Sequence, residues 1–160
     1  MKLALLILGT AATIVAATAA FAAASSTQGA RPKQLVLYGH VRSVERVHGR
    51  YQLRFDPALW LTGLAAERAC GCKPVSNDYY IVDESHRTLT FAVRRDAEVT
   101  VLARGGPIGT TSISVAELGA IVKGRNPHHR RLLEPRAGFW IRIGNAYPAP
   151  IVALEQQYQP

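Results

Sequence analysis

The chain has 160 residues, 48% of them hydrophobic, with 19 Lys and Arg against 11 Asp and Glu for a formal net charge of +8. This length allows one domain with a core of its own, which excludes a small scaffold held together mainly by disulfides. The basic charge favours partners rich in phosphate or carboxylate, although solubility alone is an alternative reason for it.

The N-terminus carries a targeting pattern. Met1 and Lys2 precede an uncharged run, Leu3 to Ala24, which ends in small residues of the A-x-A type. We predict that residues 1–24 are a signal peptide. A retained N-terminal membrane anchor is the alternative, because about 20 apolar residues can cross a bilayer. In both cases Lys2 stays on the cytoplasmic side, and the body of the protein is expected outside, secreted or anchored.

Residues 25–33 are small and polar, and we expect a disordered lead-in to a single β-rich domain at 34–160. The first strand is predicted over 34–47, where apolar residues alternate. His48-Gly49 predicts a turn, and 51–55 alternates again, so the two runs predict a hairpin.

A helix is predicted next, with Asp56 as its N-cap and Pro57 in its first position. Apolar residues follow at helical spacing, and Cys70-Gly71 marks the end. Residues 79–82 and 88–93 then predict a second hairpin, turning at 83–86.

A further strand is predicted to start at Asp96 and to end before the Gly-rich stretch 105–109. Ser114 and Glu117 form a capping box for a second helix, which ends at Gly124. The alternating residues 139–143 and the short run 151–154 predict the last strands.

This pattern indicates an α+β fold that is mostly β: a small curved sheet or an OB-like barrel with two short helices. Two segments, Asn77 to Arg87 and Ile113 to His129, resemble a group of small exported proteins of high-GC bacteria. The resemblance extends from about Leu35 to the C-terminus and implies one exported domain. No activity is assigned to that group, so no catalytic residue is carried over.

The strongest candidate site is a basic loop directly after the second predicted helix. Cations at a helix C-terminus oppose the helix dipole, but one or two suffice, and this loop has more. We expect the surplus to bind anions: an anionic envelope polymer, lipid head groups or an acidic protein. A solvated basic loop is the alternative. The candidate binding residues are Lys123, Arg125, His128, His129, Arg130 and Arg131.

The sequence therefore predicts an exported, non-catalytic binding module. It contains no nucleic-acid motif, and export does not favour nucleic acid as a partner. We expect no cofactor and no metal site, because the histidines are scattered and zinc needs three or four ligands. Membrane contact is expected only if the N-terminal segment is retained, and the oligomeric state does not follow from the sequence.

Two alternatives involve other residues. The segment Asp78–His86 has the residue types of a small extracytoplasmic hydrolase, although these types are also common in turns. Cys70 and Cys72 flank Gly71, and they are candidates for a local disulfide, which export permits. Binding of a soft metal such as Cu(I), redox work, or two thiols without a role are the other interpretations of this pair.

Overall fold

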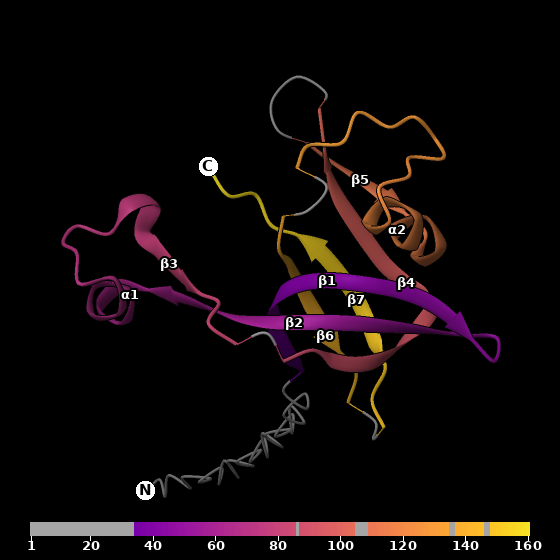
Figure 1. Ribbon diagram of the computed structural model, residues 1–160, viewed down its shortest axis with the longest axis horizontal. Coiled ribbons are helices and arrows are strands. Elements are labelled where there is room, and N and C mark those ends of the chain that lie inside the picture. Colours follow the sequence, from indigo (N-terminus) through magenta and orange to yellow (C-terminus); the bar gives the residue numbers. More distant parts are fainter. Residues whose placement is uncertain (1–33, 86, 105–108, 135–136, 146–147) are drawn as a thin grey trace, which may run out of the picture. The chain divides into compact units, whose positions relative to one another are not determined.

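The computed structural model describes residues 34–85, 87–104, 109–134, 137–145 and 148–160 (Figure 1). All of them belong to one compact unit, Arg31–Pro160. The predicted signal peptide at 1–24 and the predicted lead-in at 25–33 lie outside the described residues. In the described part of the chain, no helix is both long and apolar enough to cross a membrane.

Strands dominate the described residues, and two α-helices are placed among them. In chain order the elements are β1 (Leu35–Val47), β2 (Arg50–Thr62), α1 (Gly63–Cys70), the 3-10 turn η1 (Ser76–Asp78), β3 (Tyr79–Val82), β4 (Leu89–Ala103), β5 (Gly109–Ile113), α2 (Val115–Val122), β6 (Phe139–Ile143) and β7 (Ile151–Gln156).

Five of these strands close into a barrel. The neighbours run β2-β1-β6-β7-β4, and β4 pairs again with β2 to complete the ring. The β4–β7 pair is parallel, and the other four pairs of the ring are antiparallel. In chain order the first three barrel strands are β1, β2 and β4, and each pairs with the next one. The helix α2 lies in the chain between β4 and β6. The predicted α+β, mostly β fold with two short helices is confirmed, and of its two alternatives, a small curved sheet and an OB-like barrel, the closed barrel is the one observed.

The barrel interior is the hydrophobic core. Inward-facing side chains such as Leu53 and Phe55 of β2 and Ile141 of β6 are completely buried. The helix α2 packs against β1 and β4 and adds Leu118, which is also completely buried. At about 25 cal/mol per Å² of apolar surface, burial on this scale is the main term that stabilises the barrel.

The first predicted hairpin is present, since β1 and β2 pair antiparallel across the turn at His48 and Gly49. The predicted helix start at Asp56-Pro57 is wrong, because β2 continues through both residues to Thr62. The Asp56 carboxylate is buried and accepts hydrogen bonds from the Arg42 guanidinium, so it does not cap a helix. The helix starts at Gly63 instead and ends before Gly71, as expected.

The second predicted hairpin is also wrong. Residues of β3 pair with the far end of β2, from Leu59 to Thr62, and not with β4. The strand β4 begins at Leu89 and passes through Asp96 without a break, with only a register shift toward β7 between Val93 and Glu98. The prediction that a strand begins at Asp96 is therefore wrong. The Asp96 carboxylate accepts hydrogen bonds from the Arg94 guanidinium on the exposed face of β4.

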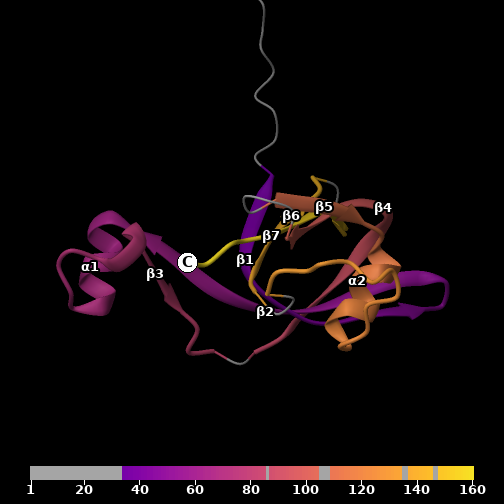
Figure 2. The same cartoon turned by 90° about the horizontal axis from the view of Figure 1, so that it is seen from above.

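The end of β2, from Leu59 to Thr62, extends beyond its pairing with the barrel strands. Together with α1 and β3 it forms an arm that both views show at the end of β2 away from the other strands (Figures 1 and 2). Aromatic rings join the arm to the barrel: Trp60 stacks on Tyr79 at 4.0 Å between ring centroids and lies 5.7 Å from Trp140. This contact gives the base of the arm a small apolar cluster of its own.

Candidate functional site

The helix α2 positions the predicted basic loop. Ser114 caps the helix, because its Oγ accepts a 3.1 Å hydrogen bond from the Glu117 backbone N–H. Gly119 lets α2 approach β1 closely: a Cβ at this position would lie 2.9 Å from the Val44 carbonyl oxygen. The end of the helix, and the loop that follows, are therefore held next to the β1–β2 hairpin.

An ion pair between a buried carboxylate and a partly exposed guanidinium holds the loop against the helix. The Arg130 Nε and Nη2 atoms donate to the two carboxylate oxygens of Glu117 at 2.5 and 3.2 Å, and Nη1 donates to Thr111 Oγ1 at 3.2 Å. The Glu117 side chain is 5% exposed. The hydrogen bond to Glu117 raises the pKa of Arg130, so the guanidinium stays charged throughout the ordinary pH range.

Backbone hydrogen bonds fix the rest of the loop. The Asn126 side chain bonds the Arg130 carbonyl at 2.7 Å and the Arg130 N–H at 2.9 Å. At the two ends of the loop, Arg125 N–H donates to the Ala120 carbonyl at 2.9 Å, and Arg104 N–H donates to the Arg131 carbonyl at 2.7 Å. These hydrogen bonds hold the backbone of the loop in one conformation.

The six predicted binding residues fall into two groups. Arg130 is engaged with Glu117, and His128 lies 4.0 Å from the same carboxylate while remaining 63% exposed. The other four side chains are exposed, and no hydrogen bond or ion pair to another described residue engages them: Lys123, Arg125, His129 and Arg131. Arg130 therefore positions the loop, and we do not assign anion binding to it.

Two of the exposed cationic side chains of the loop line the same hollow as a third cationic side chain, which belongs to a different element. Lys123 and Arg125 line a hollow of about 260 Å³ together with Arg46 and Tyr51 from the β1–β2 hairpin. Arg46 and Tyr51 are register partners across the two strands. The remaining described lining residues come from α2 and β1, and none of them is acidic. We call this feature the cationic hollow.

Arg46 was not among the residues predicted from the sequence. It lies 77 positions before Lys123, and only the docking of α2 on β1 brings the two side chains to one hollow. The sequence signal that bears on this docking is Gly119, which lies in a helix that is apolar apart from Glu117. A glycine at such a position is typical of close helix packing, but it does not say which strand is approached.

The described residues of the hydrolase alternative lie before and after β3, and most of them are exposed. Asp78 is exposed on η1, and Glu84 and Ser85 are exposed between β3 and β4. Asp83 lies beside His40 of β1, with 3.6 Å between Oδ2 and Nε2, while His86 lies outside the described residues. Over the described positions, no group of three or more His, Cys, Asp or Glu side chains is placed to hold a metal ion.

The two cysteines are joined in a disulfide at the end of α1, with Cα atoms 5.2 Å apart. The local backbone supports this geometry, because Gly71 between them adopts a left-handed conformation with φ of 63°. In this form neither sulfur is a thiolate, so the pair is not available as a ligand for a soft metal.

The fold and the cationic hollow together define an OB-like barrel with a basic concave surface beside its capping helix. Comparison with protein-family profiles, with curated proteins and with solved structures finds no match for this chain.

Proposed function

We propose that this protein is an exported, non-catalytic binding module that holds an anionic polymer of the cell envelope at the cationic hollow. One observation carries the proposal: Arg46, Lys123 and Arg125 come from two separate segments and line the same hollow, and none of its described lining residues is acidic. Like charges placed together repel one another, so an arrangement of this kind is stabilised when a polyanion occupies it.

The chemistry of the three side chains favours phosphate or carboxylate groups. Guanidinium groups donate two parallel hydrogen bonds to such oxygens, and an ammonium adds a compact positive charge. The hollow is small, at about 260 Å³, and the exposed Arg131 and His129 lie on the same loop. A repeating anion with several charges can contact both the hollow and the outer loop, whereas a single small anion can contact only one of them.

Two features support an extracytoplasmic location. The first is the leader pattern at residues 1–24, with its single Lys2 before an uncharged run. The second is the Cys70–Cys72 disulfide, because disulfides persist mainly in oxidising compartments.

The proposal is tested by sedimentation of the purified protein with isolated cell envelope at low salt. The variant Arg46→Ala/Lys123→Ala/Arg125→Ala should lose most of its retention. The matched control, Arg68→Ala/Lys73→Ala/Arg87→Ala, has the same net charge but changes exposed residues outside the hollow and the basic loop. Equal loss in both variants would show that retention follows net charge alone and would refute the site.

The ionic strength provides a second readout in the same experiment. Exposed charges interact over about 10 Å at 0.1 M salt and over about 3 Å at 1 M. Retention of the unchanged protein should therefore fall steeply over that range. Retention that persists unchanged at 1 M salt would contradict an electrostatic contact and would point to a different surface.

A further inference from the structure

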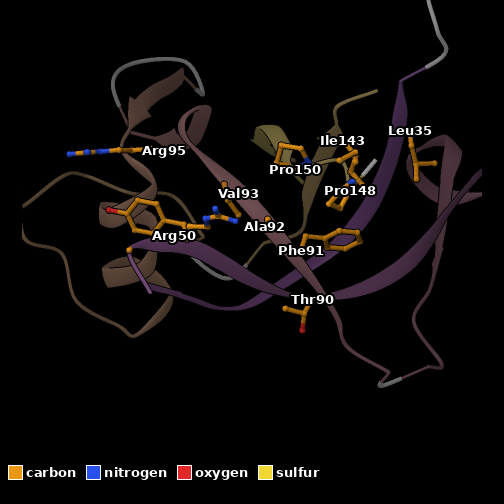
Figure 3. Close-up of a pocket in the computed structure, with 13 residues that line it drawn as sticks. Leu35, Arg50, Thr90, Phe91, Ala92, Val93, Arg95, Ile143, Pro148 and Pro150 are labelled. Carbon is orange, nitrogen blue, oxygen red and sulfur yellow. The ribbon is translucent and has the colours of Figure 1, made fainter. Parts of the chain in front are cut away.

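A second cavity is larger than the cationic hollow and shares Tyr51 with it as a lining residue. It has a volume of about 700 Å³, within the range of about 300–1,000 Å³ that is typical of small-molecule sites. Its walls come from the β1–β2 hairpin, from β4 and from the ends of β1 and β6 together with the segment before β7 (Figure 3).

The lining is mostly apolar. Phe91 forms part of the wall, and its ring also contacts the core residue Phe55 edge-on, with 6.4 Å between centroids. Ile143, Pro148 and Pro150 contribute further carbon surface. Leu35 lines the same cavity and is 55% exposed, which leaves a large apolar side chain in water unless something covers it.

The charged groups of this cavity are both positive. Arg50 and Arg95 line it, and none of its other described lining residues is Asp or Glu. In the view of Figure 3 the two arginines lie toward the opposite end of the cavity from Phe91 and Pro148. Neither arginine side chain makes a hydrogen bond or an ion pair with another of the described residues. The cavity thus combines an apolar end with a cationic end.

We infer that this cavity binds one anionic amphiphile at a time: a single acyl chain lies against the apolar wall, and its carboxylate or phosphate head faces Arg50 and Arg95. Burial of the acyl chain removes both its own surface and the exposed part of Leu35 from water. The positive end selects an anionic head over a neutral one. This site is separate from the cationic hollow, and it does not require that the proposed polymer binding be correct.

The test uses purified protein and cis-parinaric acid, a long-chain carboxylate that becomes fluorescent in apolar surroundings. Saturable binding with one site per chain is expected, and palmitate should displace the probe while its methyl ester competes roughly tenfold less well. The variant Arg50→Gln/Arg95→Gln should lose most of this preference for the carboxylate. Arg68→Gln/Arg87→Gln is the matched control, because it removes the same number of positive charges from exposed positions outside the cavity and the cationic hollow, and it should leave the binding unchanged.

A second variant tests the cavity itself. Ala149→Phe places a ring in the space of the acyl chain and should abolish binding of the probe. Since Ala149 is half-buried, its variant is used only if its circular dichroism spectrum is native. The arginine variant changes exposed side chains and remains a valid test if Ala149→Phe does not fold.

Three results would overturn the inference. The first is an absence of saturable probe binding by the unchanged protein. The second is equal competition by palmitate and by its methyl ester. The third is binding to phosphatidylglycerol vesicles without binding to monomeric amphiphile, which would assign the surface to a membrane contact and not to a single bound molecule.

Discussion

Arg130 donates hydrogen bonds to both carboxylate oxygens of Glu117, which is buried on the helix that caps the barrel. The pair joins the basic loop to α2 over 13 positions of sequence. Because Glu117 is almost inaccessible to water, its charge depends on this partner for compensation. The Glu117–Arg130 contact is thus structural, and it holds the basic loop against α2.

Replacement of Arg130 by leucine should lower the melting temperature of the protein clearly, because it leaves the Glu117 carboxylate buried without its ion-pair partner. Thermal unfolding followed by circular dichroism is the measurement. The matched control is Arg125→Leu, which removes an exposed cation from the same loop and should change the stability little.

The double variant Glu117→Leu/Arg130→Leu separates two explanations of that loss. If the buried charge is the cause, removal of both partners should recover much of the stability. If Arg130→Leu melts at the same temperature as Arg125→Leu, the ion pair does not stabilise the loop in the way described.

Gly119→Ala should destabilise the protein by about 1–2 kcal/mol, although alanine in a helix normally gains about 0.5–1 kcal/mol over glycine. The added Cβ would lie 2.9 Å from the Val44 carbonyl oxygen, so α2 must move away from β1. Ala116→Gly at an exposed position of the same helix measures the propensity term alone. A Gly119→Ala variant that is more stable in urea denaturation than the unchanged protein would refute the close contact.

Ionisation of the Tyr38 phenol should make the free energy of unfolding of the protein depend on pH in alkaline solution. Burial of the ring raises its pKa above 10.0, and the nearby Tyr79 and Asp83 raise it further, while a hydrogen bond from Gln159 partly opposes the shift. The unfolded chain then loses this proton at a lower pH than the folded chain does. The stability contributed by Tyr38 is complete below about pH 10 and is lost as the pH rises through the folded pKa.

Urea denaturation on both sides of pH 10 measures this effect. The Tyr38→Phe variant keeps the ring but lacks the phenol proton, so its stability should fall less over the same range. The difference in slope cannot exceed about 1.4 kcal/mol per pH unit for one proton. Parallel curves for the two proteins would contradict the raised pKa of Tyr38.

The sequence predicts elements well where local chemistry determines them. The alternation over 34–47 and the turn residues His48 and Gly49 predict the first hairpin, and Ser114 predicts the start of α2. The capping box is only half formed, because Glu117 turns to Arg130 instead of back to the helix start. A partner 13 positions away in an irregular loop leaves no periodic signal.

The failures have tertiary causes. Asp56 and Pro57 have the local properties of a helix start, but the Asp56 carboxylate is bound by Arg42 from the neighbouring strand, and β2 continues. Residues 79–82 have the pattern of a hairpin strand, yet they pair with β2, because that strand is long enough to leave the barrel. The cationic hollow is only partly predicted for the same reason. Lys123 and Arg125 are predicted from the concentration of charge in the loop, whereas the place of Arg46 beside them depends on how the chain folds.

Anion binding at the cationic hollow is measured most directly by an NMR titration of the purified, isotope-labelled protein with short-chain polyphosphate. We expect saturable shifts that centre on the amides of Arg46, Tyr51, Lys123 and Arg125, with the arm residues of α1 and β3 unaffected. Shifts spread evenly over all exposed arginines, or centred on the arm, would contradict a specific anion site between α2 and the β1–β2 hairpin.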